Sequence, residues 1–518
     1  MTSASIILKD SGTKERVALN RAADLVSRRP LITALLIVVL LSFLRFSGGV
    51  DSDVTGQLWI AHQLNGGARL YQDIIEVNPP LWFWMARPLD FGAALLGVRG
   101  EHLLAPLVGL LAALSLAAID RLLVSKTPLR RTAFLVYTAL ILLAMPWLEL
   151  GQREQLLLIG AIPYALLAAA RRSELHVSRW LALSVGIGAG VGFALKHYFI
   201  ICPALLELWL FTVQRRRWHP IRPETLGMGA VGLAYGVAIM LWSSDYLHSI
   251  VPMVRLAYGV TGASRLIDLF QPGVIISLVT LLLLLSQWQV LRQRPYADAA
   301  CLTVAAIGFL IAYFVQRKGW PYHAQPMLGC ASLSLLALIA GATKPARLIG
   351  LVAPALLLMP FALEVQAAAK GPRYDPDVRR AIVGLSPGEP VGFIGVDWSI
   401  GAEKGLGYPS RYMSFWMLSA VARNEALGSP DPRLTELGAS VVRNTIEDYR
   451  CLPPHRIIMA TVPSGSGNFD LLAYFRRDPQ FAELISHYRL VRQGGVQVFD
   501  QVSPLSLPGR DCIWRARD

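Results

Sequence analysis

Residues 102–124 read HLLAPLVGLLAALSLAAIDRLLV, and the only Asp, Glu, Lys or Arg in this run are Asp120 and Arg121. A helix needs about 20 mainly apolar residues to cross the hydrocarbon core of a bilayer. Ten further apolar runs occupy residues 31–46, 132–148, 155–170, 180–200, 199–213, 225–243, 272–291, 298–315, 324–341 and 346–363. The sequence therefore predicts an α-helical polytopic membrane protein with about eleven transmembrane helices.

The composition agrees with this fold class. Of the 518 residues, 54% are hydrophobic and 16% are charged, whereas a soluble domain carries about 25% charged residues. The formal net charge of +14 would indicate nucleic-acid binding in a soluble protein. Here the cations lie in short clusters between apolar runs, which is typical of membrane topology signals. We expect membrane lipids as partners and no nucleic acid.

The basic clusters also predict the orientation of the chain. The first cluster, Arg28-Arg29, precedes the first apolar run. The others follow every second run after that, at Lys126 with Arg130 and Arg131, at Arg171-Arg172, at residues 215–217, at Arg292 with Arg294, and at Lys344 with Arg347. Basic loops stay in the cytoplasm, so we expect a cytoplasmic N-terminus. Residues 1–29 are polar and lack a small-residue cleavage site, which indicates a retained first helix rather than a removed signal peptide. With an odd helix count, the C-terminal region lies outside.

Two domains are expected on this basis. Residues 1–363 form the transmembrane module, which includes a long first outer loop at residues 48–101. Residues 364–518 are richer in polar residues, Pro and Gly, and they form a soluble extracytoplasmic α/β domain. Within it we expect strands at 391–396 and 456–460, a helix at 470–488, and a hairpin at 488–499.

The five cysteines divide between the two domains. Cys202, Cys301 and Cys330 lie in apolar runs and are expected to be inert packing residues. Cys451 and Cys512 lie in the polar C-terminal region and would be able to pair in an oxidising compartment.

The first part of the first outer loop, residues 48–80, carries four carboxylates, Asp51, Asp53, Asp73 and Glu76. Carboxylates close to a bilayer are costly unless they are paired or face water. Residues 53–64 have the apolar spacing of an amphipathic helix at the membrane surface, and Asp53 is placed to cap it. A solvated loop with capping aspartates therefore explains these residues as well as a reaction site does.

The other outer loops add cations, histidine and aromatic residues. They contain Glu154, Lys196, His197, Arg317, Lys318 and His323. Taken singly, each loop has an ordinary explanation: a salt bridge at a turn, a snorkelling lysine, or an interfacial belt that binds lipid phosphate. Taken together, cations suit a phosphate leaving group, and a carboxylate suits removal of a proton from an attacking hydroxyl.

The first outer loop resembles that of GT-C fold glycosyltransferases, which include relatives of protein O-mannosyltransferase and lipid A aminoarabinose transferase. The resemblance rests on Asp53, the interfacial helix, Gly66-Gly67, Tyr71-x-Asp73 and the run from Asn78 to Leu81. Further blocks similar to a bacterial branch of this superfamily are residues 151–155, 196–198 and 316–323, Ser410-Arg411 and Trp416. The resemblance covers about residues 1–420 of the sequence.

This resemblance implies an inverting transfer of a sugar from a polyprenyl-phosphate donor to an acceptor hydroxyl. The acceptor would be a cell-envelope glycan such as lipopolysaccharide, a lipid or a protein. The reaction would occur on the outer face of the bacterial inner membrane, with the C-terminal domain in the periplasm. Some relatives need a divalent metal, but the sequence shows no convincing ligand set, and we assign none.

The resemblance also implies residue roles. Asp53 would be the catalytic base, and Glu154 would assist it or orient the acceptor. Many relatives have an adjacent Asp-Glu pair at the helix start, whereas this chain has Asp51-x-Asp53, so Asp51 remains an alternative base. The donor phosphate would be held by Lys196, His197, Arg317, Lys318 and His323. The acceptor side would be shaped by Tyr71, Asp73 and Glu76.

Two other functions remain open. A transporter or flippase for a lipid-linked sugar would be expected to carry charges near the bilayer midplane and internal repeats, whereas here the charges cluster at helix ends. A glycan ligase would use the same fold with a larger donor.

Overall fold

The computed structural model describes residues 29–505 except residues 47, 124, 262–264, 342–346, 370–374, 428, 464–466 and 468. The chain divides into two compact units. The first comprises Met1–Gly48, His102–Tyr235 and Ser264–Ala369, and the second comprises Gly49–Glu101, Gly236–Ala263 and Lys370–Asp518. The first long loop therefore belongs to the same compact unit as the C-terminal residues. The functional division at residues 363 and 364 stays a prediction.

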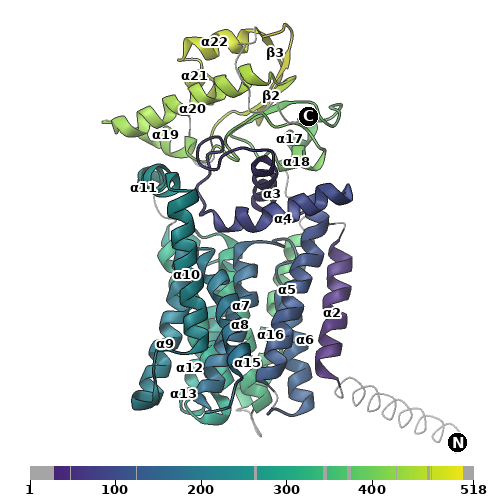
Figure 1. Cartoon of the computed structure of the whole chain (residues 1–518). Helices are drawn as coiled ribbons and strands as arrows, with labels where there is room; N and C mark the ends of the chain where they lie inside the picture. The colour runs from purple at the N-terminus through teal and green to yellow at the C-terminus, as the bar shows by residue number, and fades with distance from the viewer. Residues whose placement is uncertain are drawn as a thin grey trace, which may run out of the picture. The chain divides into compact units, whose positions relative to one another are not determined.

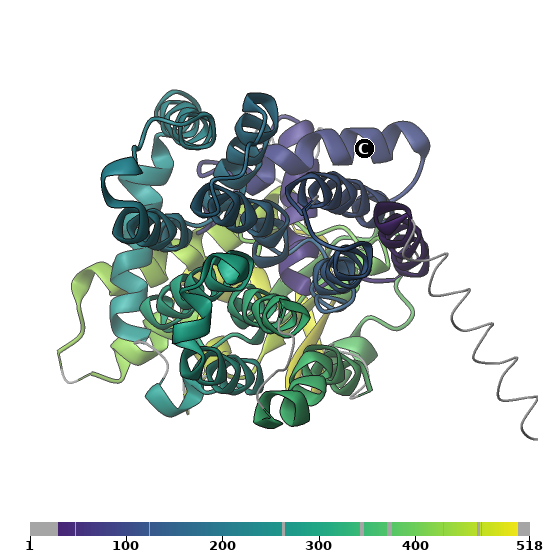
Figure 2. The same cartoon turned by 90° about the horizontal axis from the view of Figure 1, so that it is seen from below.

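Helices running side by side make up the first unit (Figures 1 and 2). They are α2 (Pro30–Arg45), α5 (Gly100–Leu122), α6 (Pro128–Leu143), α7 (Arg153–Arg172), α8 (Arg179–Ala194), α9 (Ile201–Gln214), α10 (Pro223–Trp242), α12 (Pro272–Ser286), α13 (Trp288–Leu291), α14 (Ala297–Gln316), α15 (Gln325–Gly341) and α16 (Arg347–Ala369). The last residues of α10, from Gly236 on, are counted with the second unit. Short 3₁₀ turns join several of the helices, including η1 (His197–Ile200) and η6 (Pro321–Ala324). Each of the eleven apolar runs predicted from sequence overlaps at least one of these helices.

In the part of the chain that the structure describes, seven helices are long and apolar enough to cross a membrane. They are Gly100–Leu122, Arg153–Arg172, His197–Arg217, Pro223–Trp242, Arg294–Gln316, Pro321–Gly341 and Gly350–Ala369. Three shorter apolar helices are Pro30–Arg45, Arg179–Ala194 and Pro272–Ser286. The expected class, a mostly helical multi-pass membrane protein with a small C-terminal sheet, is confirmed. The count of eleven spans and the orientation stay predictions.

Glycines allow α7 and α8 to approach each other closely. A Cβ atom built at Gly160 of α7 would lie 2.4 Å from the carbonyl oxygen of Gly188 on α8. Small residues at such crossings let helix backbones come together, which is a common basis of helix association in membranes.

Gly160→Val is therefore expected to separate the two helices and to lower the free energy of unfolding by about 1–3 kcal/mol, as overpacking does. Thermal unfolding of the purified protein in detergent measures this change. Gly229→Val on α10 is the matched control, because a Cβ there meets no atom within 4 Å. Equal loss of stability in both variants would contradict the close-packing explanation.

The second unit combines helices with a four-stranded sheet. Its helices are α3 (Ser52–Asn65), α4 (Leu81–Leu96), α11 (Val251–Thr261), α17 (Pro376–Ala381), α18 (Ser399–Glu403), α19 (Leu418–Glu425), α20 (Pro432–Cys451), α21 (Leu471–Phe475) and α22 (Pro479–Ser486). A π-helical turn at Tyr246–Ile250 precedes α11. The strands are β1 (Val391–Ile394), β2 (Arg456–Ala460), β3 (Tyr488–Gln493) and β4 (Val496–Gln501).

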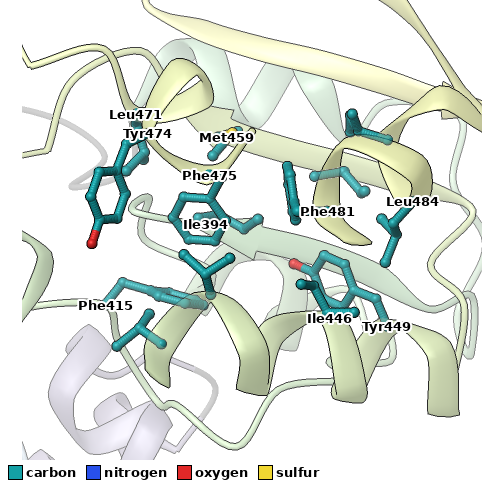
Figure 3. Packing of buried hydrophobic residues seen from close by; sticks show 14 of the residues in the cluster. Ile394, Phe415, Ile446, Tyr449, Met459, Leu471, Tyr474, Phe475, Phe481 and Leu484 are labelled. Carbon is teal, nitrogen blue, oxygen red and sulfur yellow. The ribbon is translucent and has the colours of Figure 1, made fainter. Parts of the chain in front are cut away.

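The strand order is β1-β2-β4-β3, with β1 parallel to β2 and the other two pairs antiparallel. Alternate residues of a strand point to opposite faces of a sheet. Ile457 and Met459 belong to a core shared with α20, α21 and α22, while Ile458 belongs to a second core shared with α17. Figure 3 shows the first core, where Phe475, Phe481 and Tyr449 converge between helices and strands. The predicted strands and hairpin are confirmed, except that the first strand ends at Ile394 instead of residue 396.

The prediction of one continuous helix at 470–488 is wrong. The chain forms α21 and α22, separated by residues 476–478, and Tyr488 already begins β3. Proline lacks a backbone N–H and favours the first turn of a new helix. The Asp478 side chain caps that turn by accepting from the Gln480 backbone N–H at 2.8 Å.

The cysteines fit the expected division. Cys202, Cys301 and Cys330 are buried and free. Cys451, at the end of α20, is disulfide-bonded, and its expected partner Cys512 lies outside the described residues.

Candidate active site

A buried polar cluster of the first unit joins Glu154, Lys196 and His323. The ammonium of Lys196 forms an ion pair with Oε1 of Glu154 and lies 3.0 Å from Nε2 of His323. The same imidazole nitrogen lies 3.5 Å from Oε1 of Glu154. Relative exposures are 0% for Glu154 and 8% for each of the other two residues. Charged groups are rarely this buried unless they are paired, so the packing of the helical unit holds these groups together as a specific cluster.

The ends of separate helices bring the three side chains together. Glu154 lies in the first turn of α7, where a negative charge is favoured by the helix dipole. Lys196 follows the end of α8 and precedes η1. His323 lies on η6, which Pro321 begins and which leads directly into α15.

The hydrogen-bonding roles at this centre can be assigned from chemistry. An ammonium only donates hydrogen bonds, so Nε2 of His323 accepts from Lys196 and the neutral ring carries its proton on Nδ1. That Nδ1 atom and Oε2 of Glu154 are buried without hydrogen-bond partners among the described residues. Buried polar atoms are nearly always satisfied, and two unsatisfied atoms in one cluster indicate a place for a polar ligand or water.

Further cations and aromatic rings surround the cluster. The charges of Lys196, Arg153 and Lys318 all act on the His323 ring. The Lys196 ammonium lies 5.6 Å from the centre of the Tyr322 ring and 5.9 Å from that of Phe199, within the range of cation–π attraction. Burial lowers the pKa of the half-buried Lys318 to about 8. The surroundings of His323 thus gather several positive charges in a partly water-excluded place.

Two residues outside the predicted site also line this region. Glu149 is buried, and its Oε2 accepts a hydrogen bond from Nε2 of Gln325 at 3.2 Å. Arg153 is buried beside Glu154. The sequence signal for both is their place in the short polar run 149–155, where a salt bridge at a turn is the ordinary explanation. Only the three-dimensional contacts separate them from ordinary loop residues.

Two predicted phosphate ligands are not brought into this cluster. His197 is exposed, and its ring lies against that of Tyr198, with centroids 3.8 Å apart and the ring planes tilted by 42°. Arg317 is exposed and caps α14 with a left-handed backbone, φ 51°. Their assignment to the donor phosphate stays a prediction.

The start of α3 in the second unit corrects the expected cap. Asp51, not Asp53, is the N-cap residue: its Oδ1 accepts from the backbone N–H of Asp53 at 3.0 Å. Asp53 lies in the first turn, half-buried. The helix thus begins two residues earlier than it would with Asp53 as its cap, and Asp51 has the capping role that was expected for Asp53.

The loop after α3 is held by its own polar side chains. Asp73 accepts hydrogen bonds from the Arg69 guanidinium at 3.1 Å and from the Arg69 backbone N–H at 2.8 Å. Oε1 of the buried Glu76 accepts from the backbone N–H and the side-chain amide of Asn78, at 3.0 and 2.6 Å. The hydroxyl of Tyr71, a residue with φ 71°, donates to the carbonyl of Asn78 at 2.6 Å. Tyr71, Asp73 and Glu76 therefore shape this loop, and their place on the acceptor side stays a prediction.

The C-terminal residues of the second unit support this loop. The backbone N–H of Ile75 donates to the carbonyl of Arg411 at 2.7 Å. The Arg411 guanidinium in turn donates to Asp448, Asn444 and Glu447. The segment that contains Ser410 and Arg411, which resembles the bacterial branch, thus contacts the first long loop directly.

Metal ligands form no cluster in the part of the chain that the structure describes: no three His, Cys, Asp or Glu residues are grouped to hold an ion.

These features define a class: a polytopic membrane protein with a buried, cation-rich polar centre where the ends of its helices meet. The sequence matches no protein-family model and no curated protein. Among solved structures, the archaeal oligosaccharyltransferase AglB from Archaeoglobus fulgidus, in complex with an inhibitory peptide and a dolichol-phosphate, is similar to this chain. The TM-score is 0.44 and the sequence identity 12%, over 92% of this chain and 74% of that chain. A likeness this distant assigns no activity to the chain, whose function has to be argued from its own residues.

Proposed function

We propose that the protein is a membrane glycosyltransferase that moves a sugar from a polyprenyl-phosphate donor to a hydroxyl of a cell-envelope acceptor. The observation that carries the proposal is the buried cluster of Lys196, Glu154 and His323 with Arg153 and Lys318 around it. A lipid-linked phosphate is an anion that must be bound near the membrane, and a cation-rich centre at helix ends suits it.

Each group of the centre has a role in this proposal. Lys196 holds its ammonium beside Glu154 and His323, and a phosphate oxygen would accept a hydrogen bond from this cation. The Nδ1–H of His323 and the Lys318 ammonium add further donors for the phosphate oxygens. As the bond between the anomeric carbon and the phosphate oxygen breaks, negative charge grows on the leaving phosphate. Fixed cations that stabilise such charge are worth about 3–4 kcal/mol per donor in comparable sites.

Asp53 is proposed as the general base. It would accept the acceptor's hydroxyl proton while the oxygen attacks the anomeric carbon from the side opposite the phosphate, which inverts the configuration. Asp51 already serves as the helix cap, which favours Asp53 for the chemical role. Glu154 is proposed to hold Lys196 through their ion pair and to assist the reaction.

A transporter for a lipid-linked sugar is the second candidate. Its support is the burial of Glu154 and Lys196 among membrane helices, since intramembrane ion pairs also mark ion-coupled transport. Cells that lack the protein distinguish the two functions. Loss of a transferase leaves the sugar-lipid donor accessible to an impermeant reagent added from outside, and the acceptor glycan lacks one sugar. Loss of a flippase leaves the donor inaccessible, and that result would overturn the proposal.

Binding of the lipid phosphate is expected to weaken with rising pH. Lys318 has a pKa lowered to about 8 by burial, so its charge is present at pH 7 and is lost as the pH rises through that value. The phosphate keeps its charge over this range, because its second pKa is about 6. The Kd for polyprenyl phosphate should therefore rise about tenfold between pH 7 and pH 9, the change expected when one proton is required.

Two variants control for this interpretation. Lys318→Gln should bind more weakly at pH 7 and lose the pH dependence. Lys318→Arg should retain tight binding to higher pH, since arginine remains charged. A Kd that rises equally with pH in Lys318→Gln would show that another group titrates.

A further inference from the structure

A cavity of the second unit lies outside the proposed reaction centre. It has a volume of about 540 Å³ and is lined by Asn65, Trp84, Arg87, Pro88, Phe91 and Trp242. The indole rings of Trp84 and Trp242 meet edge to face with centroids 6.3 Å apart. The lining of one cavity thus combines aromatic residues and an arginine. None of these residues has a role in the proposed mechanism.

Arg87 is held in a defined position beside this cavity. Its Nε donates to Oδ1 of Asn65 at 2.9 Å, and Nδ2 of Asn65 donates back to the Arg87 carbonyl at 2.9 Å. Among the described residues, the two terminal guanidinium nitrogens have no hydrogen-bond or ion-pair partner. A guanidinium fixed through Nε presents these nitrogens as a fork that matches a phosphate.

A carboxylate lies one turn further along the same helix. Asp90 accepts from Nδ2 of Asn65 at 2.8 Å, and its other oxygen lies 3.2 Å from Nδ1 of His62. The side chain keeps 16% of its surface exposed. Residues three apart on a helix are neighbours, with Cβ atoms about 5–6 Å apart. The cavity lining therefore holds a guanidinium and indole faces that attract ammonium groups. The Asp90 carboxylate lies at its edge, hydrogen-bonded to the lining residue Asn65.

The surroundings indicate a membrane surface. Trp242 is the last residue of α10, which is long and apolar enough to cross a membrane, and tryptophan is enriched where spanning helices leave the bilayer. On α4, Phe91, Leu95 and Leu96 have exposures of 61%, 73% and 68%. Such large apolar side chains in a row on one helix suit contact with lipid acyl chains.

We propose that this cavity binds the headgroup of a zwitterionic ethanolamine phospholipid. The phosphate would accept hydrogen bonds from the terminal nitrogens of Arg87, and the primary ammonium would lie between Asp90 and the indole faces of Trp84 and Trp242. The acyl chains would run along Phe91 and Leu95. This inference is independent of the proposed glycosyl transfer.

Native mass spectrometry of the full chain tests it, with dioleoyl-phosphatidylethanolamine, -phosphatidylcholine and -phosphatidylglycerol as probes. We expect preferential retention of phosphatidylethanolamine and about tenfold weaker binding by Arg87→Gln, since a hydrogen bond to a charged group is worth about 1.5–3 kcal/mol. Asp90→Asn should lower the preference for phosphatidylethanolamine over phosphatidylglycerol. Arg476→Gln is the control, because Arg476 is an exposed arginine away from the cavity.

Three results would overturn the proposal. One is equal retention of phosphatidylethanolamine and phosphatidylglycerol by the unmodified protein, a measurement that needs no variant to fold. Another is the same loss of binding in Arg87→Gln and Arg476→Gln. The third is equal binding of phosphatidylcholine and phosphatidylethanolamine, which would remove the Asp90 contact with a primary ammonium.

Discussion

Asp53→Asn is expected to lower sugar transfer by about 10²–10⁴-fold, the usual cost of losing a general base. The substitution keeps the shape of the side chain and removes only its ability to take a proton. The α3 helix should persist, because its cap is the Asp51 side chain, which accepts from a backbone N–H. Initial rates with a polyprenyl-phosphate sugar donor measure the effect, and circular dichroism confirms the fold.

Asp51→Asn is the matched control. Asparagine caps a helix about as well as aspartate, so this variant should retain nearly normal transfer and stability. Asp51→Ala should lose about 1 kcal/mol of stability, the typical value of a cap. An active, folded Asp53→Asn protein would remove Asp53 from the role, and an inactive Asp51→Asn protein would transfer the role to Asp51.

Among the variants proposed here, Lys196→Met should cause the largest loss in the free energy of unfolding. It leaves the Glu154 carboxylate, with 0% exposure, without the ammonium that pairs with it. Removing one partner of a buried ion pair costs about 3–5 kcal/mol. The double variant Lys196→Met with Glu154→Gln should recover much of this loss, because no unpaired charge remains. Chemical unfolding of the purified variants measures these differences.

A second ion pair of the first unit provides the comparison. Lys126 and Asp298 are 2.7 Å apart but have side chains 29% and 18% exposed. Lys126→Met should therefore cost little, about 0–1 kcal/mol as for partly hydrated pairs. The double variant at Lys196 and Glu154 should remain inactive even where it is stable, since the phosphate donors are gone. Normal transfer by that variant would show that the pair is only structural.

The helices could be predicted from sequence because length and apolarity alone determine whether a segment can lie in a bilayer. The run at 102–124, for example, overlaps almost all of α5 (Gly100–Leu122). The strands at 391–394 and 456–460 were predictable from short apolar runs between turn residues. Helix ends were harder, because they depend on which polar side chain caps the backbone. Asp51 and Asp53 are both good caps, and only the geometry shows that Asp51 accepts the bond.

The candidate site could be predicted only as a set of residue types. Glu154, Lys196 and His323 come from three helix ends, separated by 42 and 127 residues. Their meeting depends on how the helices pack, which no local pattern reports. His197 and Arg317 have the same residue types in the same loops, yet both side chains are exposed. Neighbouring residues at helix ends point in different directions, so sequence alone does not separate a ligand from its neighbour.

The central claim is that the centre formed by Lys196, Glu154 and His323 holds the phosphate of a lipid-linked donor. An experimental structure of the full chain with bound polyprenyl phosphate tests this most directly. We expect density for the phosphate within hydrogen-bonding distance, about 2.7–3.2 Å, of the Lys196 ammonium or of Nδ1 of His323, with Lys318 turned toward it. Density for the phosphate at another place, with the Lys196 centre unchanged, would contradict the claim.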